Sequence, residues 1–551
     1  MTVPTDQPAD LVLRGGRIAT MDAARRFVSA LAVRGGRIVA VGTDGVVRDR
    51  VGPRTRVIEL RGRTVTPGFQ DAHVHPVGGG LDRLRCDLHD TRGRDALLAV
   101  IAEYARSHPD APWIQGGGWS MADFPGGTPR REDLDRIVPD RPVFLPNRDG
   151  HGAWVNSRAL EIAGITATTT DPSDGRIERD PDGSPTGTLH EGAADLVEAL
   201  LPDDTPDDLE AALRIGQAYL HSLGITAWQD AIVQPATEER AYVALASRGE
   251  LTARVVGAMW WERQRGAEQI DEFVARRATT SIGRYQATSV KLMMDGVLEN
   301  FTGAMLEPYG DGHGGTTANR GLLQIDPGGL ADWVPKLDAL GFQPHFHAIG
   351  DGAVRASLDA VEAARRINGA SDTRPHIAHI QVIQPDDIGR FRELGVAANA
   401  QPYWACHEGQ MDDLTIPFIG DRWRWQYPFR SLRAAGAVLA MGSDWSVSTP
   451  DPLLEIEVAV ERVADGSRGV REPFLPDERL ELIDALAAFT AGSAYVNHLD
   501  DTGTIEVGKL ADVAILDRDL FDRGAGAIGE ARVVGTFVDG VVVHEDAALD
   551  G

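Results

Sequence analysis

TPGFQDAHVHP, residues 66–76, has the pattern of a short buried strand that ends in two histidines, His73 and His75. Residues i and i+2 of a strand point to the same side, so both imidazoles can reach one metal ion. Histidines on strands are also common as hydrogen-bonded core residues, so this motif alone is a weak indication of a metal site. The ends of the other strands must therefore be compared with it.

Seven further apolar runs of strand length follow along the chain, and helical patterns such as 351–366 lie between several of them. The runs are 224–230, 253–260, 289–296, 342–348, 375–380, 395–402 and 437–444. Alternating strands and helices are typical of parallel βαβ units. Eight such units predict an α/β fold, a TIM-type (β/α)8 barrel whose catalytic groups lie at the C-terminal ends of its strands.

The two ends of the chain differ from the middle and carry short alternating strands, with a hairpin signal at Asp539–Gly540. We expect residues 1–66 and 490–551 to form one composite β-sandwich beside a barrel of residues 67–489. The connection between the first two barrel strands is far longer than an ordinary loop. Residues 77–222 are therefore predicted to form an inserted cap subdomain over the barrel mouth.

Composition narrows the function classes. The chain has 551 residues, 42% of them hydrophobic, and its 82 acidic and 55 basic residues give a net charge of −27. This balance argues against nucleic-acid binding and against docking on anionic lipid. Only two cysteines, Cys86 and Cys406, are present, so no disulfide framework is expected. No membrane-spanning run and no secretory pattern is visible, so we expect a cytoplasmic protein.

Polar side chains stand at the ends of several predicted strands. They are His73, His75, Lys291, His347, His379 and Asp444. Such imidazole, lysine and carboxylate groups at a barrel mouth suit a zinc-like ion that lowers the pKa of bound water to about 7. Alone, Lys291 could be an ion-pair partner and Asp444 a helix N-cap, but their regular placement favours one shared site. We assign His345 to barrel packing and His376 to a structural or supporting role.

Seven motifs together resemble the amidohydrolase superfamily, in its YtcJ-like branch, amidohydrolase family 3. They are TPGFQDAHVHP (66–76), DGHGAWVNSRAL (149–160), SVKLMMDG (289–296), FHAIGDGAV (346–354), RPHIAHIQ (374–381), MGSDWSVSTPDPL (441–453) and GTIEVGKLADVAILD (503–517). The likeness covers nearly the whole chain. It implies a barrel with a β-sandwich built from both chain ends.

The resemblance also implies a role for each strand-end residue. His73 and His75 would bind one ion, and His347 and His379 a second, most simply two zinc ions. Lys291, carboxylated by CO₂, would bridge them. Asp444 would complete the first site and act as general base and then as general acid.

The same resemblance implies hydrolysis of a C–N bond in a small amide, because the branch includes deformylases of N-substituted formamides. An N-acyl or N-formyl amine is the expected substrate. The alternative is a cyclic amide, a carbamate or an ester cleaved by the same metal centre. A non-catalytic barrel is disfavoured because all six ligand positions are filled, and a lyase or isomerase would be separated by its products. Relatives are often dimers, so a homodimer is an expected assembly.

Five residues are candidates for contacting the substrate. They are Trp119, His151, Glu191, Asp295 and Trp404. His151 would donate a hydrogen bond to the substrate carbonyl or its developing oxyanion, which makes it a candidate catalytic residue. Trp119 could equally be packed inside the cap, and Glu191 could be an exposed residue at a helix start. Asp295 could orient supporting groups, and Trp404 could line the pocket.

Two other features have ordinary explanations. A nucleophilic Cys406 beside His407 is discounted, because a metal site already supplies the nucleophile. The aromatic and basic stretch 420–430 could suit base stacking, but at this net charge a packed loop or a subunit contact explains it better.

Overall fold

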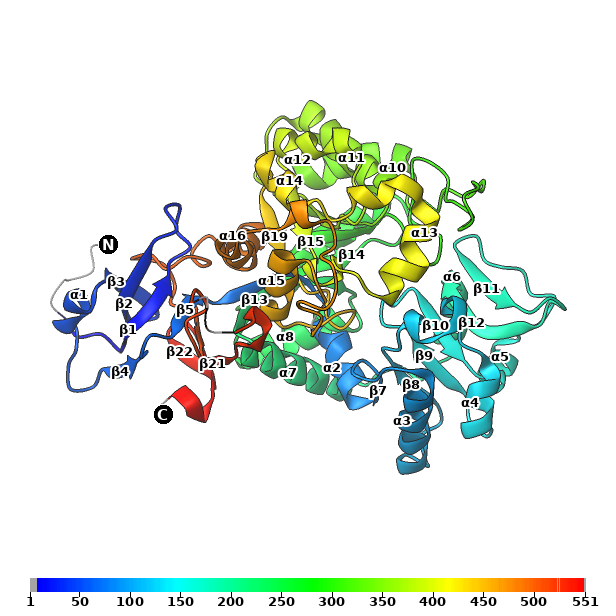
Figure 1. Cartoon of the computed structure of the whole chain (residues 1–551), viewed down its shortest axis with the longest axis horizontal. Helices are drawn as coiled ribbons and strands as arrows, with labels where there is room; N and C mark the ends of the chain where they lie inside the picture. The colour runs from blue at the N-terminus through cyan, green and yellow to red at the C-terminus, as the bar shows by residue number, and fades with distance from the viewer. Residues whose placement is uncertain (1–6, 465, 523, 525, 550–551) are drawn as a thin grey trace.

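The molecule is elongated, with three units arranged along its long axis (Figure 1). The computed structural model describes residues 7–464, 466–522, 524 and 526–549. A sheet that holds both chain ends lies at one end, the barrel in the middle, and the inserted subdomain at the other end. The barrel therefore stands between the two.

The central unit is an eight-stranded, nearly closed parallel barrel, which confirms the predicted fold class. Neighbouring strands pair in parallel in the order β6-β13-β14-β15-β16-β17-β18-β19. They are β6 (Phe69–Val74), β13 (Ile225–Val233), β14 (Arg254–Trp260), β15 (Tyr285–Met293), β16 (Gln343–Ala348), β17 (His376–His379), β18 (Ala397–Ala400) and β19 (Leu439–Met441). Each predicted run overlaps one of them, although β13 extends past residue 230 and β15 begins before residue 289.

Two backbone hydrogen bonds join the last strand to the first. The amide of Asp444 donates to the carbonyl oxygen of His73 at 2.7 Å, and the amide of His75 donates to that of Trp445 at 2.7 Å. These bonds lie at the C-terminal end of β6 and just beyond that of β19. The first and last strands of the barrel therefore meet at the place where polar groups from both strands were expected.

Helices cover the outside of the barrel. They include α7 (Pro206–Ser222), α8 (Glu238–Arg248), α9 (Ile270–Thr280), α10 (Pro327–Ala339), α11 (Asp351–Asn368), α12 (Ile388–Leu394), α14 (Phe429–Ala434), α15 (Pro452–Glu461) and α16 (Leu482–Ala487). Helix α11 covers the stretch predicted as helical. Its Val354, Leu358 and Val361 are buried at the spacing of one helix face, so apolar periodicity attaches it to the sheet.

Strands from both chain ends form one mixed sheet. Its order is β22-β21-β20-β5-β1-β2-β3, and β4 also pairs with β1. The strands are β1 (Leu11–Ala19), β2 (Phe27–Arg34), β3 (Arg37–Gly42), β4 (Arg56–Glu59), β5 (Thr64–Pro67), β20 (Val513–Leu516), β21 (Val533–Val538) and β22 (Val541–Glu545). The Asp539–Gly540 turn, with φ of 52° and 70°, joins β21 to β22. The limits 1–66 and 490–551 stay a prediction; residues 1–6, 523, 525, 550 and 551 lie outside the described residues.

The inserted subdomain has its own six-stranded sheet and its own core. The sheet order is β11-β12-β10-β9-β8-β7. Its strands are β7 (Cys86–Asp87), β8 (Ile114–Gly117), β9 (Val143–Pro146), β10 (Gly152–Val155), β11 (Gly175–Arg179) and β12 (Pro185–Glu191), with helices α3 (Arg94–Ser107), α4 (Arg131–Ile137), α5 (Ser157–Ala163) and α6 (Gly192–Glu198). Helices α2 (Pro76–Leu84) and α7 flank this unit and pack on each other. The limits 77–222 include α7 and all but the first residue of α2, and they stay a prediction.

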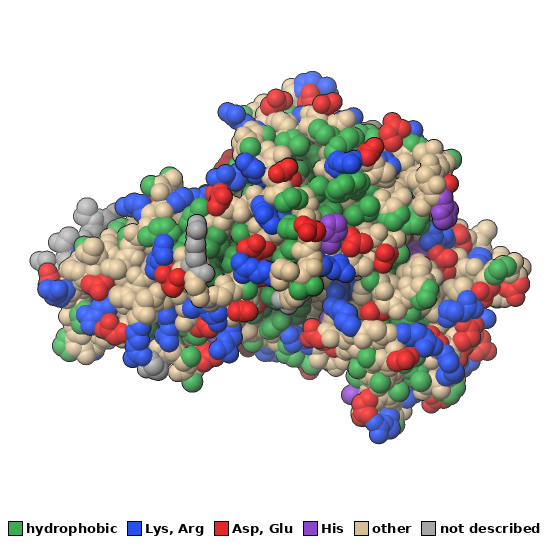
Figure 2. All heavy atoms as spheres, viewed as in Figure 1, with side chains coloured by type: hydrophobic (Ala, Val, Ile, Leu, Met, Phe, Trp, Pro, Cys, Tyr) green, Lys and Arg blue, Asp and Glu red, His purple; other side chains and the backbone are tan. Residues whose placement is uncertain are grey.

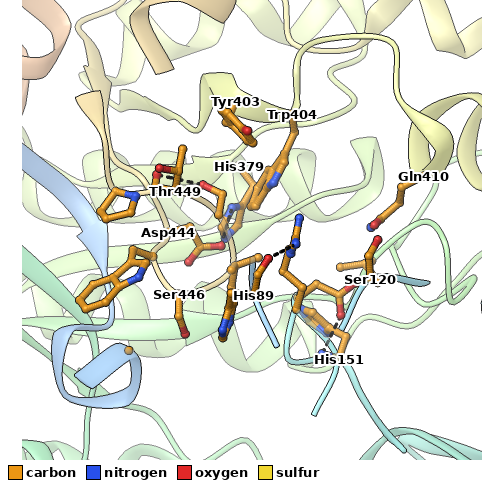
Figure 3. A pocket seen from close by; sticks show the side chains of 18 of the residues that line it. His89, Ser120, His151, His379, Tyr403, Trp404, Gln410, Asp444, Ser446 and Thr449 are labelled. Atoms are coloured by element: carbon orange, nitrogen blue, oxygen red, sulfur yellow. Dashed lines mark hydrogen bonds and ion pairs between the residues drawn. The ribbon is translucent and has the colours of Figure 1, made fainter. Parts of the chain in front are cut away.

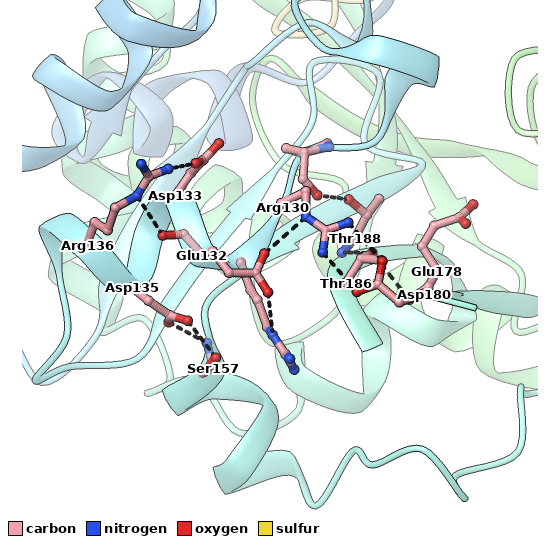
Figure 4. A network of polar contacts seen from close by, with 12 residues as sticks. Arg130, Glu132, Asp133, Asp135, Arg136, Ser157, Glu178, Asp180, Thr186 and Thr188 are labelled. Atoms are coloured by element: carbon pink, nitrogen blue, oxygen red, sulfur yellow. Dashed lines mark hydrogen bonds and ion pairs between the residues drawn. The ribbon is translucent and has the colours of Figure 1, made fainter. Parts of the chain in front are cut away.

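Polar contacts connect the outer elements of this subdomain (Figure 4). Arg130 donates to both carboxylate oxygens of Asp180 at 2.9 and 2.8 Å, and Ser157 donates to Asp135 at 2.6 Å. These contacts attach helix α4 to the β11–β12 turn and to α5. Such partly exposed pairs stabilise the fold only modestly, so the buried apolar core supplies most of the stability.

Charges of both signs are interspersed over the face seen in Figure 2. The excess of acidic residues is therefore not gathered into one block on this face. Among the residues that the structure describes, no helix is long and apolar enough to cross a membrane.

Candidate active site

The structure brings the six predicted ligands into one cluster at the C-terminal ends of the barrel strands, with all but the partly exposed His75 buried. Oδ1 of Asp444, which follows β19, lies 3.1 Å from Nε2 of His73 and 2.9 Å from Nε2 of His75. Nζ of Lys291, on β15, lies 3.3 Å from Nε2 of His73. The barrel junction therefore joins groups that are hundreds of residues apart in the chain.

His347 and His379 complete the cluster. Their ring centres are 4.5 Å apart, and the ring of His379 lies 4.7 Å from that of His73. Nδ1 of His379 is 4.0 Å from Oδ2 of Asp444. Strands β16 and β17 pair in parallel, which places the ends that carry these two histidines side by side.

The donors of this cluster fit a divalent metal ion. Ligand atoms of His73, His379 and Asp444 all lie within 4.8 Å of one another, and all three residues are buried. The buried Nδ1 atom of His379 forms no hydrogen bond within the described part of the chain. Buried polar atoms normally have partners, and imidazole with carboxylate is the ligand set that zinc prefers. A bound ion would supply the missing partner.

Burial sets the charge states of the cluster. It lowers the pKa values of His73, His347 and His379 well below 6.5, so these imidazoles are neutral, as metal ligands must be. Burial also lowers the pKa of Lys291 to about 7. Burial would raise the pKa of Asp444, but the hydrogen bond with His75 and electrostatic interactions with His379 and Lys291 outweigh it and lower the pKa. Asp444 is therefore a carboxylate.

Two ligands have an unusual backbone conformation. Asp444 has φ of 56° and His379 has φ of 73°, a region that non-glycine residues rarely adopt. His379 is held there partly by Gln401, whose side-chain oxygen accepts a 2.7 Å hydrogen bond from its amide. Strain of this kind is concentrated at functional sites, where surrounding contacts must stabilise it.

A layer of buried residues orients the ligands. Asp71 accepts hydrogen bonds from the amide of His73 at 3.0 Å and from the hydroxyl of Ser443 at 2.6 Å. Nε2 of His345 lies 2.9 Å from Nδ1 of His73, so His345 supports a ligand in addition to packing in the barrel. His376 contacts Gln229 at 2.9 Å, which agrees with a supporting role. Asp71 was not predicted as a site residue. The alternation of a strand, which places it on the same face as His73 and His75, could have indicated it.

A cavity of about 190 Å³ lies between this cluster and the inserted subdomain. Figure 3 shows His379, Asp444 and Trp404 on the barrel side, facing His89 and His151 from the subdomain. The ring of Trp404 lies 5.7 Å from that of His379. The structure therefore places Trp404 and His151 at the cavity wall, where the sequence predicted substrate contacts.

His151 forms a buried pair with Glu191. Nδ1 of His151 is 3.0 Å from Oε2 of Glu191, and Thr302 donates to the other carboxylate oxygen at 2.6 Å. The side-chain amide of Asn300 donates to the carbonyl oxygen of His151 at 2.9 Å. Burial opposes the imidazolium form, but the carboxylates of Glu191 and Asp149 outweigh it and raise the pKa of His151 to about 9. His151 is thus a charged donor beside His347, whose ring centre is 5.5 Å away.

Three predicted substrate residues have other positions. Trp119 is buried against Phe124 in the subdomain core, and its Nε1 donates to the carbonyl of Leu145 at 2.8 Å, so the packing alternative describes it. Glu191 is neither exposed nor at the cavity wall, because it is bonded to His151 and Thr302. Asp295 is fully buried and accepts three backbone hydrogen bonds, with Oδ1 3.3 Å from Nδ1 of His347. Both carboxylates act on other side chains.

Several ionisable residues at the cavity wall were not predicted. They include Asp82, His89, Arg92, Arg148, Asp149, Glu299 and Glu408. They come from the inserted subdomain and from loops after barrel strands, and no short motif links them. Arg148 directly precedes the DGHGAWVNSRAL motif, which was the one available signal.

Comparison with known proteins identifies the family. A family model described as "Amidohydrolase family" matches residues 56–544. The chain belongs to the amidohydrolase family. Protein LONG AFTER FAR-RED 3 of Arabidopsis thaliana is 32% identical over 98% of this amidohydrolase and 92% of that protein. N-substituted formamide deformylase of Arthrobacter pascens is 29% identical over 98% and 99%, and the putative amidohydrolase YtcJ of Bacillus subtilis is 29% identical over 97% and 99%.

A solved structure agrees with this assignment. An uncharacterized metal-dependent hydrolase from Pyrococcus horikoshii is 25% identical, with a TM-score of 0.72, over 94% of this amidohydrolase and 99% of that chain. The resemblance predicted from the motifs is thus confirmed, and the chain is placed among metal-dependent hydrolases.

Proposed function

We propose that the protein hydrolyses the C–N bond of a small N-acyl or N-formyl amine with two zinc ions. The cluster of six predicted ligands carries this proposal, because three of them, His347, His379 and Asp444, line one cavity together with His151. The formamide deformylase among the relatives supports a C–N bond as the target. The cavity volume of about 190 Å³ suits a small substrate.

The residues present divide naturally between two ions. His73, His75 and Asp444 would hold the first, and His347 and His379 the second. Lys291, buried among these groups with its pKa lowered to about 7, has a neutral amine available for reaction with CO₂, and the carbamate would bridge both ions. Such ions supply Lewis acidity, which lowers the pKa of water and polarises a carbonyl group.

Asp444 would handle the proton. Its carboxylate would accept the proton of the attacking water and then deliver it to the nitrogen of the leaving amine. Its contacts with His73 and His75 hold it at the cavity wall in the ionised form that the first step requires.

His151 would stabilise the developing charge on the carbonyl oxygen. Its Nδ1 is engaged by Glu191, and within the described residues its Nε2 has no hydrogen-bond partner, so that nitrogen is left to donate in the cavity. A fixed donor of this kind lowers the barrier because it is in place before the charge develops.

A direct experiment tests the reaction type. The purified protein is loaded with zinc in bicarbonate buffer and incubated with a panel of N-formyl and N-acetyl amines, and amine and free acid are measured. We expect one mole of each per amide cleaved, and loss of activity after chelation. Full activity after exhaustive chelation would refute the metal mechanism. Turnover of esters, carbamates or cyclic amides without turnover of open-chain amides would refute the substrate class.

A further inference from the structure

Two arginines of the inserted subdomain donate to one main-chain oxygen at the cavity wall. Nη2 of Arg148 lies 2.7 Å from the carbonyl oxygen of His89, and Nη1 of Arg92 lies 2.7 Å from the same atom. Both side chains line the cavity that the ligand cluster also lines. Two positive charges are therefore held close together at this wall.

Neither guanidinium forms an ion pair with a carboxylate among the described residues. Glu408 and Asp123 act on Arg148 only through their charges at longer range. Among the described residues, the hydrogen bonds of both side chains go to backbone oxygens, and a guanidinium has five N–H donors. Burial and the neighbouring charge of Arg92 lower the pKa of Arg148, which reflects a cation without a close counter-ion. An anion bound in the cavity would offset both the burial of the Arg148 charge and its repulsion by Arg92.

The backbone around Arg148 is fixed. Its amide donates to the carbonyl of Trp119 at 2.8 Å, and the amide of Gly150 donates to the carbonyl of Asn147 at 3.1 Å, which closes the turn between β9 and β10. His151 follows on the same turn. The cationic wall and the proposed oxyanion donor are therefore positioned by one rigid segment.

We propose that Arg148, assisted by Arg92, binds a carboxylate of the substrate away from the amide that is cleaved. A planar guanidinium matches a carboxylate with two parallel hydrogen bonds. The substrate class would then be N-acyl or N-formyl amino acids, which carry both groups. This inference rests on the proposed function, because it names the substrate of the same site. Glu299, also at the wall, would disfavour an anion in its own part of the cavity.

The experiment compares two amides that differ only in the carboxylate. N-formyl-phenylalanine, as each enantiomer, and N-formyl-phenethylamine are hydrolysed by the zinc-loaded full chain and by Arg148→Gln. We expect the better enantiomer to exceed the neutral amide in kcat/KM by roughly 10- to 100-fold, and the ratio to fall toward one in Arg148→Gln. Arg148→Lys, which keeps the charge but not the fork, should give an intermediate ratio. A ratio near one in the unmodified protein, or an equal loss on both amides, would overturn the proposal.

Control variants separate specificity from folding. Arg136→Gln replaces an exposed arginine of α4 that does not line the cavity, and it should keep the preference of the unmodified protein. If Arg148→Gln fails to fold, judged by metal content and Tm, Arg92→Gln at the exposed rim provides the second test, with a smaller fall in the ratio.

Binding is measured separately from turnover. Calorimetry with N-formyl-phenylalanine and the zinc-loaded protein should give at least roughly 10-fold weaker binding to Arg148→Gln than to the unmodified protein. If neither amide is cleaved but this difference is found, the proposed reaction fails and the carboxylate site stands. If the amides are cleaved but affinity and kcat/KM do not depend on the carboxylate, the carboxylate site is refuted and the proposed reaction stands.

Discussion

Nδ1 of His151 lies 3.0 Å from Oε2 of Glu191, and the ring of His151 lies 5.5 Å from that of His347 in the cluster of predicted ligands. The carboxylate keeps the imidazole charged, because it helps to raise the pKa of His151 to about 9. The imidazolium is therefore the main form up to about pH 9 and is lost above it. Glu191, which was expected to touch the substrate, contacts His151 instead.

Glu191→Gln should remove this support. Without the carboxylate, burial dominates and the pKa of His151 falls, so the charged donor is lost at a lower pH. We expect kcat to fall by about 10- to 100-fold at pH 8 and the alkaline limb of the kcat profile to move to lower pH. Glu161→Gln, at an exposed position of α5, is the matched control. An alkaline limb that stays in place would contradict the pairing.

Asp444→Asn should separate metal binding from proton transfer. The amide oxygen can still act as a ligand, but it cannot accept a proton from water. We expect metal content near that of the unmodified protein and a loss of kcat of about 10²- to 10⁴-fold. Asp421→Asn, which changes a highly exposed carboxylate, should leave both values unchanged. Near-normal turnover in Asp444→Asn would exclude its role as general base.

Lys291→Ala should disrupt the bridged pair of ions. The variant should bind less zinc, measured by elemental analysis, and short carboxylic acids should restore part of the activity by replacing the carbamate. Lys336→Ala, on the surface of α10, is the control. Unchanged metal content in Lys291→Ala would show that no carbamate bridge is needed.

Cys406→Ser should leave the kinetics unaltered. Burial raises the pKa of this thiol far above its usual range, so the thiolate that a nucleophile requires is absent. Its Sγ donates to the carbonyl oxygen of Tyr403 at 3.4 Å, a contact that serine can keep. A loss of kcat greater than about 10-fold at unchanged metal content would reopen a thiol mechanism.

Acid stability should depend on Glu178, which lies in the inserted subdomain (Figure 4). The hydrogen bond from His190 and the charge of Arg176 lower its pKa to about 2 from an ordinary 4.5. Between these values the unfolded chain binds more protons than the folded chain, so the stabilisation is complete above pH 4.5 and lost as the pH falls toward 2. After solvent screening we expect Glu178→Gln to lower the free energy of unfolding at neutral pH by about 1–2 kcal/mol.

Urea unfolding at several pH values measures this effect. The difference between Glu178→Gln and the unmodified protein should shrink as the pH falls below 4.5. Glu362→Gln, at an exposed position of α11, is the control. A difference that is independent of pH would mean that the variant acts through packing.

The barrel and the meeting of the six candidate ligands at one end of it were predictable because each strand carries a local signal. A strand such as 66–75 combines an apolar run with polar residues at its end, and the parallel barrel brings all such ends to one face. No local signal exists for contacts that pass through the backbone. Arg92 and Arg148 meet at a carbonyl oxygen of His89, and every residue type has that oxygen. The sequence around Trp119 is compatible with a pocket residue and with a core residue, so only the packing in the structure distinguishes the two.

The hydrogen bond from the amide of Asp444 to the carbonyl of His73 closes the barrel between its last and first strands, at the same place as the candidate active site. A nascent chain on the ribosome carries both histidines of the first strand long before it carries Asp444. It cannot gather the whole ligand set until the eighth strand has emerged and the barrel has closed. Zinc binding by nascent chains stalled at successive lengths would thus report when the barrel closes. Incomplete chains would have no hydrolytic activity before that point.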